Sequence, residues 1–418
     1  MTDSEQPRSP GHQVRDLVVW TVLTGLGLVA VLVGARHAAL GTQAAPFLGR
    51  YRVAPGPWLA VAALLAVAVL LVAWRTRRAA PPFGLVQLVS YGAALAWTLT
   101  LSAGAGLGAR TGEAGVAAGS PLAYLRDFVD RHAAAAHGHP PGPALLLWAL
   151  REAGLPVAFT VTALGALAVP LALAAVRNVA GDLPARRYAP VLVLAPYLLF
   201  LAGSPDGVAA ALGAGMVAAG ARASDRRRTG WPATGWALGC GLLLGLAGMA
   251  SYSVVWLGVS VVLLYFARRR AFLNVATGLG ALVVPVVAAA LGFSWPAGLL
   301  TAHAGFTSRP ASELLWGPVS LVTLLLVAGP PLVASMRKMR NTPGWPCLVG
   351  AGIAVAFSVV AGVAHGGAET AWLPFIGFLT LAATAPERQA GPPVPAPLLL
   401  TAVGAGTALV LAAILTPA

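Results

Sequence analysis

Charge is scarce in this chain. Of its 418 residues only 10% are Asp, Glu, Lys or Arg, whereas 58% are hydrophobic, and the mean hydropathy is +0.79. A soluble domain of that composition would expose a large apolar surface, so the composition excludes an ordinary soluble protein. In a bilayer the backbone polar groups must be satisfied within a helix or a closed barrel. The long apolar runs favour helices, and we therefore expect an all-α polytopic membrane protein.

Cysteine and acidic residues are also scarce. The two cysteines, Cys240 and Cys347, are too few for a disulfide framework and lie in or beside apolar runs, where they serve as small packing residues. Thirteen acids stand against 27 basic residues, which gives a net charge of +14. In a soluble protein that excess would indicate nucleic-acid binding. Here the basic residues form short clusters between apolar runs, a pattern that orients membrane helices, so we expect no nucleic-acid partner.

About thirteen apolar runs are long enough to be membrane-spanning helices. They lie at 17–35, 57–74, 83–104, 155–176, 189–203, 207–222, 232–249, 251–267, 272–292, 314–335, 346–364, 371–385 and 396–415. If the N-terminus is cytoplasmic, the alternating loops put nineteen of the 27 basic residues inside, as the positive-inside rule requires. Lys338 is the only lysine beside abundant arginine, which is typical of a GC-rich genome. We therefore expect a multi-pass protein of a bacterial plasma membrane.

The longest outer segment, 105–152, differs from the rest of the chain. Residues 124–132 place apolar and charged side chains on different faces, which predicts a short amphipathic helix at the membrane interface. The run His137-Gly138-His139-Pro140-Pro141-Gly142 follows. Because two prolines forbid a preceding helix, a new helix is expected to start near Pro143. Tyr252, at another predicted helix end, is interpreted as an aromatic residue of the membrane interface.

Four motifs resemble integral-membrane glycosyltransferases of the C type, specifically the dolichyl-phosphate-mannose protein mannosyltransferase and aminoarabinose transferase group. They are Glu113, His139-Pro140-Pro141-Gly142, Ser204-Pro205-Asp206 and Glu369-Thr370-Ala371-Trp372. Two positions depart from the family pattern, since Ala114 replaces a second acid and Ala371 replaces a basic residue. The resemblance implies two domains: a cytoplasmic tail with two accessory helices in 1–82, and a glycosyltransferase-like core in 83–418.

The resemblance also implies an activity, in which a sugar moves from a polyprenyl-phosphate donor to a glycan, glycolipid or protein acceptor on the outer face. Such a reaction needs a carboxylate near the acceptor hydroxyl and cationic or donor groups for the leaving phosphate. The candidate catalytic carboxylates are Glu113, Asp127 and Asp130. The candidate donor-binding residues are Arg131, His137, His139, Asp206, Arg309 and Glu369.

Plainer interpretations stand beside these. Asp127 and Asp130 could simply pair with Arg126, Arg131 or His132 on a solvated helix, and Asp206 could be a turn-forming residue. The outer histidines are candidate ligands for a divalent metal, although none has ligand spacing on a predicted helix. Two other functions remain open: a transporter, which would need ionisable residues at the bilayer midplane, and a non-catalytic scaffold of the same fold.

The predicted topology can be tested at His137. A His137→Cys variant should react with a membrane-impermeant maleimide added to intact cells, because residue 137 is expected on the outer face. Labelling is measured against the parent chain, whose two cysteines lie in apolar segments. Labelling only after the cells are opened would place the 105–152 loop in the cytoplasm.

Overall fold

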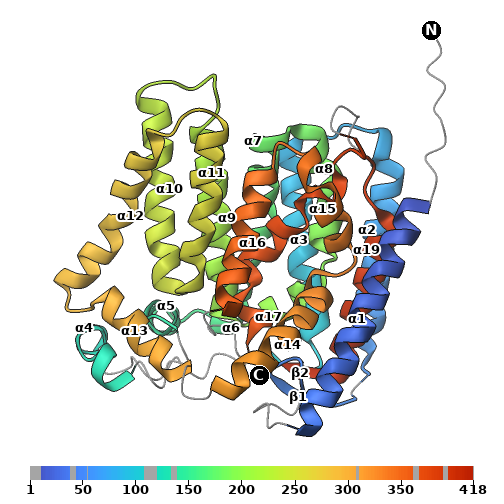
Figure 1. The fold of residues 1–418 in the computed structure, drawn as a ribbon, viewed down its shortest axis with the longest axis horizontal. Coiled ribbons are helices and arrows are strands. Elements are labelled where there is room, and N and C mark those ends of the chain that lie inside the picture. Colours follow the sequence, from blue (N-terminus) through green and yellow to red (C-terminus); the bar gives the residue numbers. More distant parts are fainter. Residues whose placement is uncertain are drawn as a thin grey trace.

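The computed structural model describes residues 11–37, 44–53, 55–107, 120–132, 139–306, 310–360, 367–388 and 394–417. Within these ranges the chain is helical almost throughout, and the regular strands form one two-stranded antiparallel sheet. Figure 1 shows the long helices standing side by side in a bundle. The predicted all-α fold is confirmed.

From the N-terminus, the first half of the chain forms α1 (Gly11–His37), β1 (Gly49–Tyr51), α2 (Pro57–Arg75), η1 (Thr76–Arg78), α3 (Phe83–Ser102), α4 (Pro121–Arg126), the π-helical turn η3 (Phe128–His132), α5 (Gly142–Glu152), α6 (Val157–Ala166), α7 (Ala168–Ala180), α8 (Asp182–Val193), η4 (Pro196–Leu201) and α9 (Pro205–Ala223). The second half forms α10 (Trp231–Ala250), η5 (Ser253–Leu257), α11 (Gly258–Ala267), α12 (Leu273–Ala290), α13 (Trp295–Phe306), α14 (Pro310–Ala328), α15 (Pro331–Lys338), η6 (Met339–Asn341), α16 (Trp345–Val360), α17 (Ala368–Ala371), α18 (Leu373–Leu379), η7 (Leu381–Thr384), α19 (Leu398–Ile414) and β2 (Leu415–Pro417).

Six helices in the described ranges are long and apolar enough to cross a membrane. They are His12–Val33, Pro57–Arg75, Phe83–Ser102, Val157–Ala180, Trp231–Ala250 and Leu273–Ala290. A seventh results if α14 and α15 count together as one bent span. The protein therefore has the helices of a multi-pass membrane protein, and the larger number of thirteen crossings stays a prediction.

Proline and glycine interrupt two of the predicted spans. The run 314–335, expected as one span, consists of Trp316–Ala328 and Pro331–Asn341, which meet at an angle of 101°. Gly329 has φ +70°, and the two prolines after it cannot donate helical hydrogen bonds to the preceding turn. In the run 189–203 the α-helix ends at Val193, because the residue before Pro196 is restricted to extended backbone.

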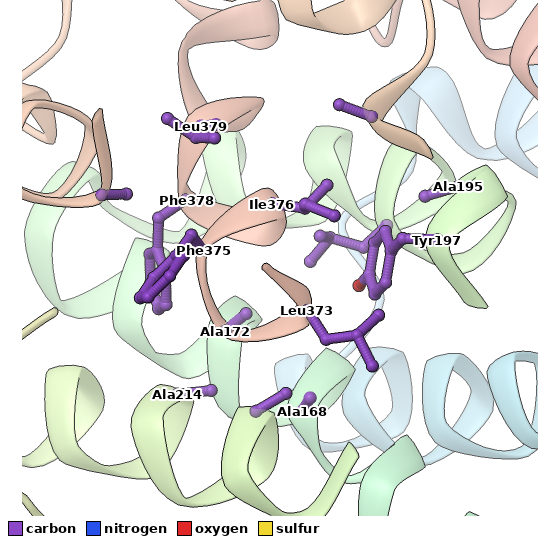
Figure 2. Close-up of a cluster of buried hydrophobic side chains, with 14 of the residues drawn as sticks. Ala168, Ala172, Ala195, Tyr197, Ala214, Leu373, Phe375, Ile376, Phe378 and Leu379 are labelled. Atoms are coloured by element: carbon purple, nitrogen blue, oxygen red, sulfur yellow. The ribbon is translucent and has the colours of Figure 1, made fainter. Parts of the chain in front are cut away.

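Helix α9 forms the centre of the bundle. Nearly all its residues are buried, most of them Ala or Gly, and it contacts α7, α10, α11 and α18. Figure 2 shows the adjoining packing, in which Leu373, Phe375 and Phe378 of α18 lie over the small residues Ala168, Ala172 and Ala214. Lipid is as apolar as leucine, so such contacts stabilise the bundle by close packing rather than by excluding water.

Helices α10 and α12 approach each other through glycines. A Cβ on Gly241 would lie 1.9 Å from the carbonyl oxygen of Thr277, and one on Gly280 would lie 2.3 Å from that of Leu238. The two backbones are thus in direct contact, an arrangement that small residues allow between membrane helices.

The bundle has two chemically different ends. The arginine-rich end contains the α7–α8 turn, residues 224–230, residues 268–272 and η6, whereas the Asp206 end contains α4, α5, α13, α17 and the small sheet (Figure 1). At the arginine-rich end Arg337 pairs with Asp16, at 2.9 Å, and with Glu387. Burial alone would raise the pKa of Glu387, but the hydrogen bond from Arg337 and the charge of Lys338 hold this pKa below its usual value.

The N-terminal helices are packed onto the rest of the bundle at both ends. At one end lies the Arg337–Asp16 pair, and along the helix the indole of Trp20 donates to the carbonyl of Leu325 at 2.8 Å. At the Asp206 end β1 pairs with β2 near the C-terminus, and the ring of Phe47 stacks on Phe200 at 5.4 Å between centroids. The segment between α1 and α2 therefore covers part of the Asp206 end.

The α10–α12 contact gives a stability prediction. Gly241→Ala should lower the free energy of unfolding by about 1–3 kcal/mol, because the new methyl group collides with the backbone of α12. Gly239→Ala on the same helix meets nothing within 4 Å, and should be neutral or stabilising by up to about 1 kcal/mol through helix propensity. Apparent melting temperatures of the purified variants in detergent test this contrast. Equal melting temperatures would show that α10 and α12 are not in close contact.

Candidate functional site

The candidate site lies where α9 begins. Ser204 is the N-cap residue, and its hydroxyl accepts a hydrogen bond from the backbone N–H of Asp206 at 3.3 Å. Pro205 occupies the first helical position, where its missing N–H costs nothing. Gly203, with φ +63°, turns the chain into the helix. The sequence Gly-Ser-Pro-Asp thus places a carboxylate at the N-terminal, positive end of a buried helix.

His139 of the His-Pro-Pro-Gly run faces this carboxylate. Its Nδ1 lies 3.7 Å from Oδ1 of Asp206, and the side chains are 31% and 9% exposed, respectively. The pair is ionic only when His139 is protonated. As predicted, a helix starts directly after the two prolines, since α5 begins at Gly142. The structure therefore brings together two motifs that are distant in the sequence, and Asp206 contacts a side chain outside its own turn.

Close backbone contacts fix the two motifs to the bundle. A Cβ on Gly142 would lie 2.0 Å from the carbonyl oxygen of Met249, so this glycine rests on the end of α10. The backbone N–H of Gly203 donates to the hydroxyl of Thr162 at 2.8 Å. These contacts hold His139 and Asp206 in place from α10 and α6, which gives the pair a rigid support.

The short turn between α10 and η5 adds further polar groups at this end. The hydroxyls of Ser251 and Ser253 are 3.0 Å apart, and Ser253 also donates to the carbonyl of Ala371 in α17 at 3.4 Å. Tyr252 is buried, although the sequence predicts an interface aromatic, and its ring meets Trp295 edge to face at 5.3 Å. No sequence signal distinguishes this tyrosine from a lipid-facing one.

Glu369 is buried at the same end but has a partner from the N-terminal segment. Its Oε1 accepts a hydrogen bond from the backbone N–H of Leu48 at 2.7 Å, and the residue is 2% exposed. The sequence predicts Glu369 as a donor-binding residue from its position before Trp372. Its observed contact fastens the α1–α2 segment to α17, a pairing that no local pattern indicates.

The acids of the amphipathic segment make no ion pair with the His139–Asp206 pair among the residues that the structure describes. Tyr124, Leu125 and Phe128 are buried, and the ring of Phe128 packs against Phe293 at 5.4 Å, so the amphipathic prediction is confirmed. Asp127 pairs with Arg131 at 3.0 Å on a solvated face.

Asp130 is also exposed. Within the described ranges no ion pair joins Asp127, Asp130 or Arg131 to the His139–Asp206 pair. The plainer interpretation of Asp127, a local ion pair, is therefore what the structure shows.

Three predicted site residues, Glu113, His137 and Arg309, lie outside the described residues. Leu107, the last described residue before Glu113, still locates the start of that segment. A Cβ on Gly203 would lie 2.5 Å from the carbonyl oxygen of Leu107. The chain that continues toward Glu113 therefore starts beside the turn that carries Asp206.

A small pocket opens next to the same turn. It lies between the end of α3, η4 and β2, and its lining includes Ser102, Ala202 and Leu415. The hydroxyl of Ser102 is buried and has no hydrogen-bond partner among the described residues. For metals, the described part of the chain contains no group of three or more His, Cys, Asp or Glu side chains that could hold an ion.

Comparisons with protein-family models, curated proteins and solved structures found no match to this chain. The site is therefore interpreted from its own geometry. A carboxylate and an imidazole, supported by buried backbone contacts at one end of a membrane bundle, can hold hydroxyl and phosphate groups of a polar ligand.

The His139–Asp206 contact can be measured with a double-mutant cycle. Asp206→Asn and His139→Gln, separately and together, should reveal a coupling of about 1 kcal/mol, because the pair is partly shielded from water. The matched control is the solvated pair Asp127 and Arg131, where Asp127→Asn and Arg131→Gln should couple by less than about 0.5 kcal/mol. Reversible unfolding in mixed detergent micelles gives both values. A coupling near zero for the first pair would contradict the geometry.

Proposed function

We propose that this protein is a membrane glycosyltransferase that moves a sugar from a polyprenyl-phosphate donor to an acceptor on the outer face of the membrane. The observation that supports this function best is the His139–Asp206 pair. The pair joins the His-Pro-Pro-Gly motif to the Ser-Pro-Asp motif at the end of a buried helix. Both motifs are among those that resemble the membrane glycosyltransferases, and the resemblance implies that they serve one site.

The proposed reaction assigns simple roles to these residues. The acceptor hydroxyl attacks the anomeric carbon of the sugar, the bond from this carbon to the phosphate oxygen breaks, and polyprenyl phosphate leaves. A carboxylate takes the proton of the hydroxyl. The imidazole of His139 donates to the phosphate, and Asp206 orients the imidazole through Nδ1 or accepts from a sugar hydroxyl. The prenyl tail stays among the apolar helices.

We assign the proton-accepting role to Glu113 in preference to Asp127 and Asp130. The segment leading to Glu113 departs from Leu107, whose carbonyl lies against Gly203, three residues before Asp206. Asp127, by contrast, is paired with Arg131 on a solvated face, and Asp130 is exposed. Asp127, whose charge is already paired in water, is therefore a weaker candidate for the base than Glu113, which follows Leu107 by six residues.

We also propose that the chain crosses a bacterial plasma membrane thirteen times, with its N-terminus in the cytoplasm. Support comes from four shorter apolar helices, Ser253–Ala267, Trp345–Val360, Leu373–Thr384 and Leu398–Ile414, which bring the candidate crossings to ten or eleven. The two remaining predicted runs, 189–203 and 207–222, coincide with α8–η4 and α9. Support also comes from the separation of charge, because α1 begins at the arginine-rich end and β2 lies at the Asp206 end (Figure 1). The positive-inside rule then makes the arginine-rich end cytoplasmic.

A transporter is the second candidate, and the broken α14–α15 pair favours it, because transporters often bind their substrates at interrupted helices. The surroundings of the break argue against it. A Cβ on Gly329 would meet Gly404 and Pro196 at 3.5 Å, so apolar groups fill the bend. The buried charged residues in the described ranges, Asp16, Asp206, Lys338 and Glu369, lie toward the ends of the bundle. An ion-coupled transporter would need such groups at mid-membrane.

A transfer assay tests the enzyme. Membranes that contain the full chain should move radiolabelled sugar from a polyprenyl-phosphate donor to endogenous acceptor. Glu113→Gln should lower the rate by about 100-fold or more, the usual loss when a catalytic base is removed. Asp206→Asn should weaken donor binding and raise the apparent KM. The control, Glu152→Gln, changes an exposed glutamate at the end of α5 in the same loop region and should leave the rate unchanged.

Two outcomes would contradict this assignment. No transfer from a panel of polyprenyl-phosphate sugars would favour the transporter or a scaffold without activity. Transfer that depends on Asp127 or Asp130 but not on Glu113 would move the base to the amphipathic segment.

A further inference from the structure

Six arginines gather in two neighbouring turns at the arginine-rich end. The turns are residues 224–230, between α9 and α10, and residues 268–272, between α11 and α12. The arginines are Arg226, Arg227, Arg228, Arg268, Arg269 and Arg270. Asp225 is the one acid in these two turns, so the local charge is strongly positive.

Two of the six arginines are engaged inside the protein. Arg268 donates to the carbonyl of Asn178 at 2.8 Å and to that of Ala221 at 3.1 Å. Arg270 donates to the carbonyls of Ala223 and Asp225 at 3.3 and 3.0 Å. These cations satisfy carbonyl groups at the ends of α7 and α9 and favourably meet the negative ends of the helix dipoles. They also hold the two turns side by side.

The other four arginines face outward. Arg226, Arg227 and Arg269 are exposed, Arg228 is half-buried, and in the described ranges no salt bridge joins them to a carboxylate. Arg269 has φ +58°, the left-handed conformation that side-chain-bearing residues rarely adopt, and it is the one non-glycine residue with positive φ in the described chain. This strained backbone conformation costs free energy, and it turns the side chain of Arg269 away from the inward-facing Arg268 and Arg270 on either side of it.

Large exposed aromatic side chains lie next to these turns in the sequence. Trp231, at the start of α10, is 85% exposed, and Trp236 carries the guanidinium of Arg222 over its ring at 4.8 Å. Phe266 and Phe272 flank the second turn and are also exposed. Exposed tryptophan beside arginine is typical of the level of the lipid headgroups.

We propose that an arginine–tryptophan patch, formed by Arg226, Arg227, Arg228, Arg269, Trp231 and Trp236, binds the phosphate groups of anionic phospholipids in the adjacent leaflet. Guanidinium groups suit phosphate because they form paired charge-assisted hydrogen bonds with it. The occupant is a lipid rather than a soluble anion because α12 leads from the patch with an apolar exposed face that includes Val275, Leu279 and Leu282. A lipid that places its headgroup on the patch lays its chains on that face.

Native mass spectrometry of the purified full chain tests the proposal. The chain is titrated with phosphatidylglycerol and, separately, with phosphatidylcholine of the same chain length. Wild type should retain phosphatidylglycerol at least about tenfold more tightly, since each arginine near an anionic surface contributes roughly fivefold. The variant Arg226→Gln/Arg227→Gln/Arg228→Gln/Arg269→Gln should lose that preference. Equal affinity of wild type for the two lipids would overturn the proposal without any variant.

Two further variants distinguish a specific patch from general charge. Replacing the same four arginines by lysine should keep only part of the preference, because the charge is retained but the paired hydrogen bonds of the guanidinium groups are lost. Arg50→Gln/Arg52→Gln, at the Asp206 end, removes two exposed arginines away from the patch and should change nothing. If inorganic phosphate displaced bound phosphatidylglycerol as effectively as added phosphatidylglycerol does, the patch would bind any phosphate anion rather than a lipid, which would also overturn the proposal. Unchanged lipid preference in the glutamine variant would do the same.

Discussion

The close approach of helices around α9 is the constraint on which the rest of the structure depends. Alanine and glycine leave little side chain on α9, so α7, α10, α11 and α18 can surround it. A helix so enclosed must also bury its first turn, and that turn carries Asp206. A carboxylate in this position needs a compensating group, and the positive end of the helix dipole and His139 supply it. The candidate site is thus a consequence of how tightly the bundle packs.

The charged side chains at the two ends of the bundle have different kinds of partner. At the arginine-rich end, cations such as Arg268 donate hydrogen bonds to the carbonyls where helices end. The outward-facing arginines are exposed at the surface of the bundle. At the Asp206 end, by contrast, buried carboxylates have protein partners: Asp206 lies 3.7 Å from Nδ1 of His139, and Glu369 accepts a hydrogen bond from the backbone N–H of Leu48. Lipid chains in the middle offer no partners, so charge is confined to these ends. The distribution favours chemistry at a surface over ion movement through the bundle.

Several local features follow directly from the residues. The break before α5 comes from two prolines, the amphipathic face of Phe128 from its spacing with Tyr124 and Leu125, and the helical fold from the apolar runs. Other features need more than one segment. Hydropathy does not reveal the bend at Gly329, because the residues on both sides of it are apolar. Glu369 stands out for its motif, yet its observed bond to Leu48 joins segments at opposite ends of the chain.

The sequence by itself therefore determined that the apolar runs are helical, that a helix starts after Pro140 and Pro141, and which motifs carry ionisable groups. These properties depend on neighbours within one turn. Only the tertiary structure decided that His139 meets Asp206 while Asp127 meets Arg131 in water. The reason is physical: a helix face that packs on protein and one that faces lipid are both apolar, so hydropathy does not record which helices are neighbours. That choice comes from shape, from where a glycine such as Gly241 or Gly142 allows two backbones to touch.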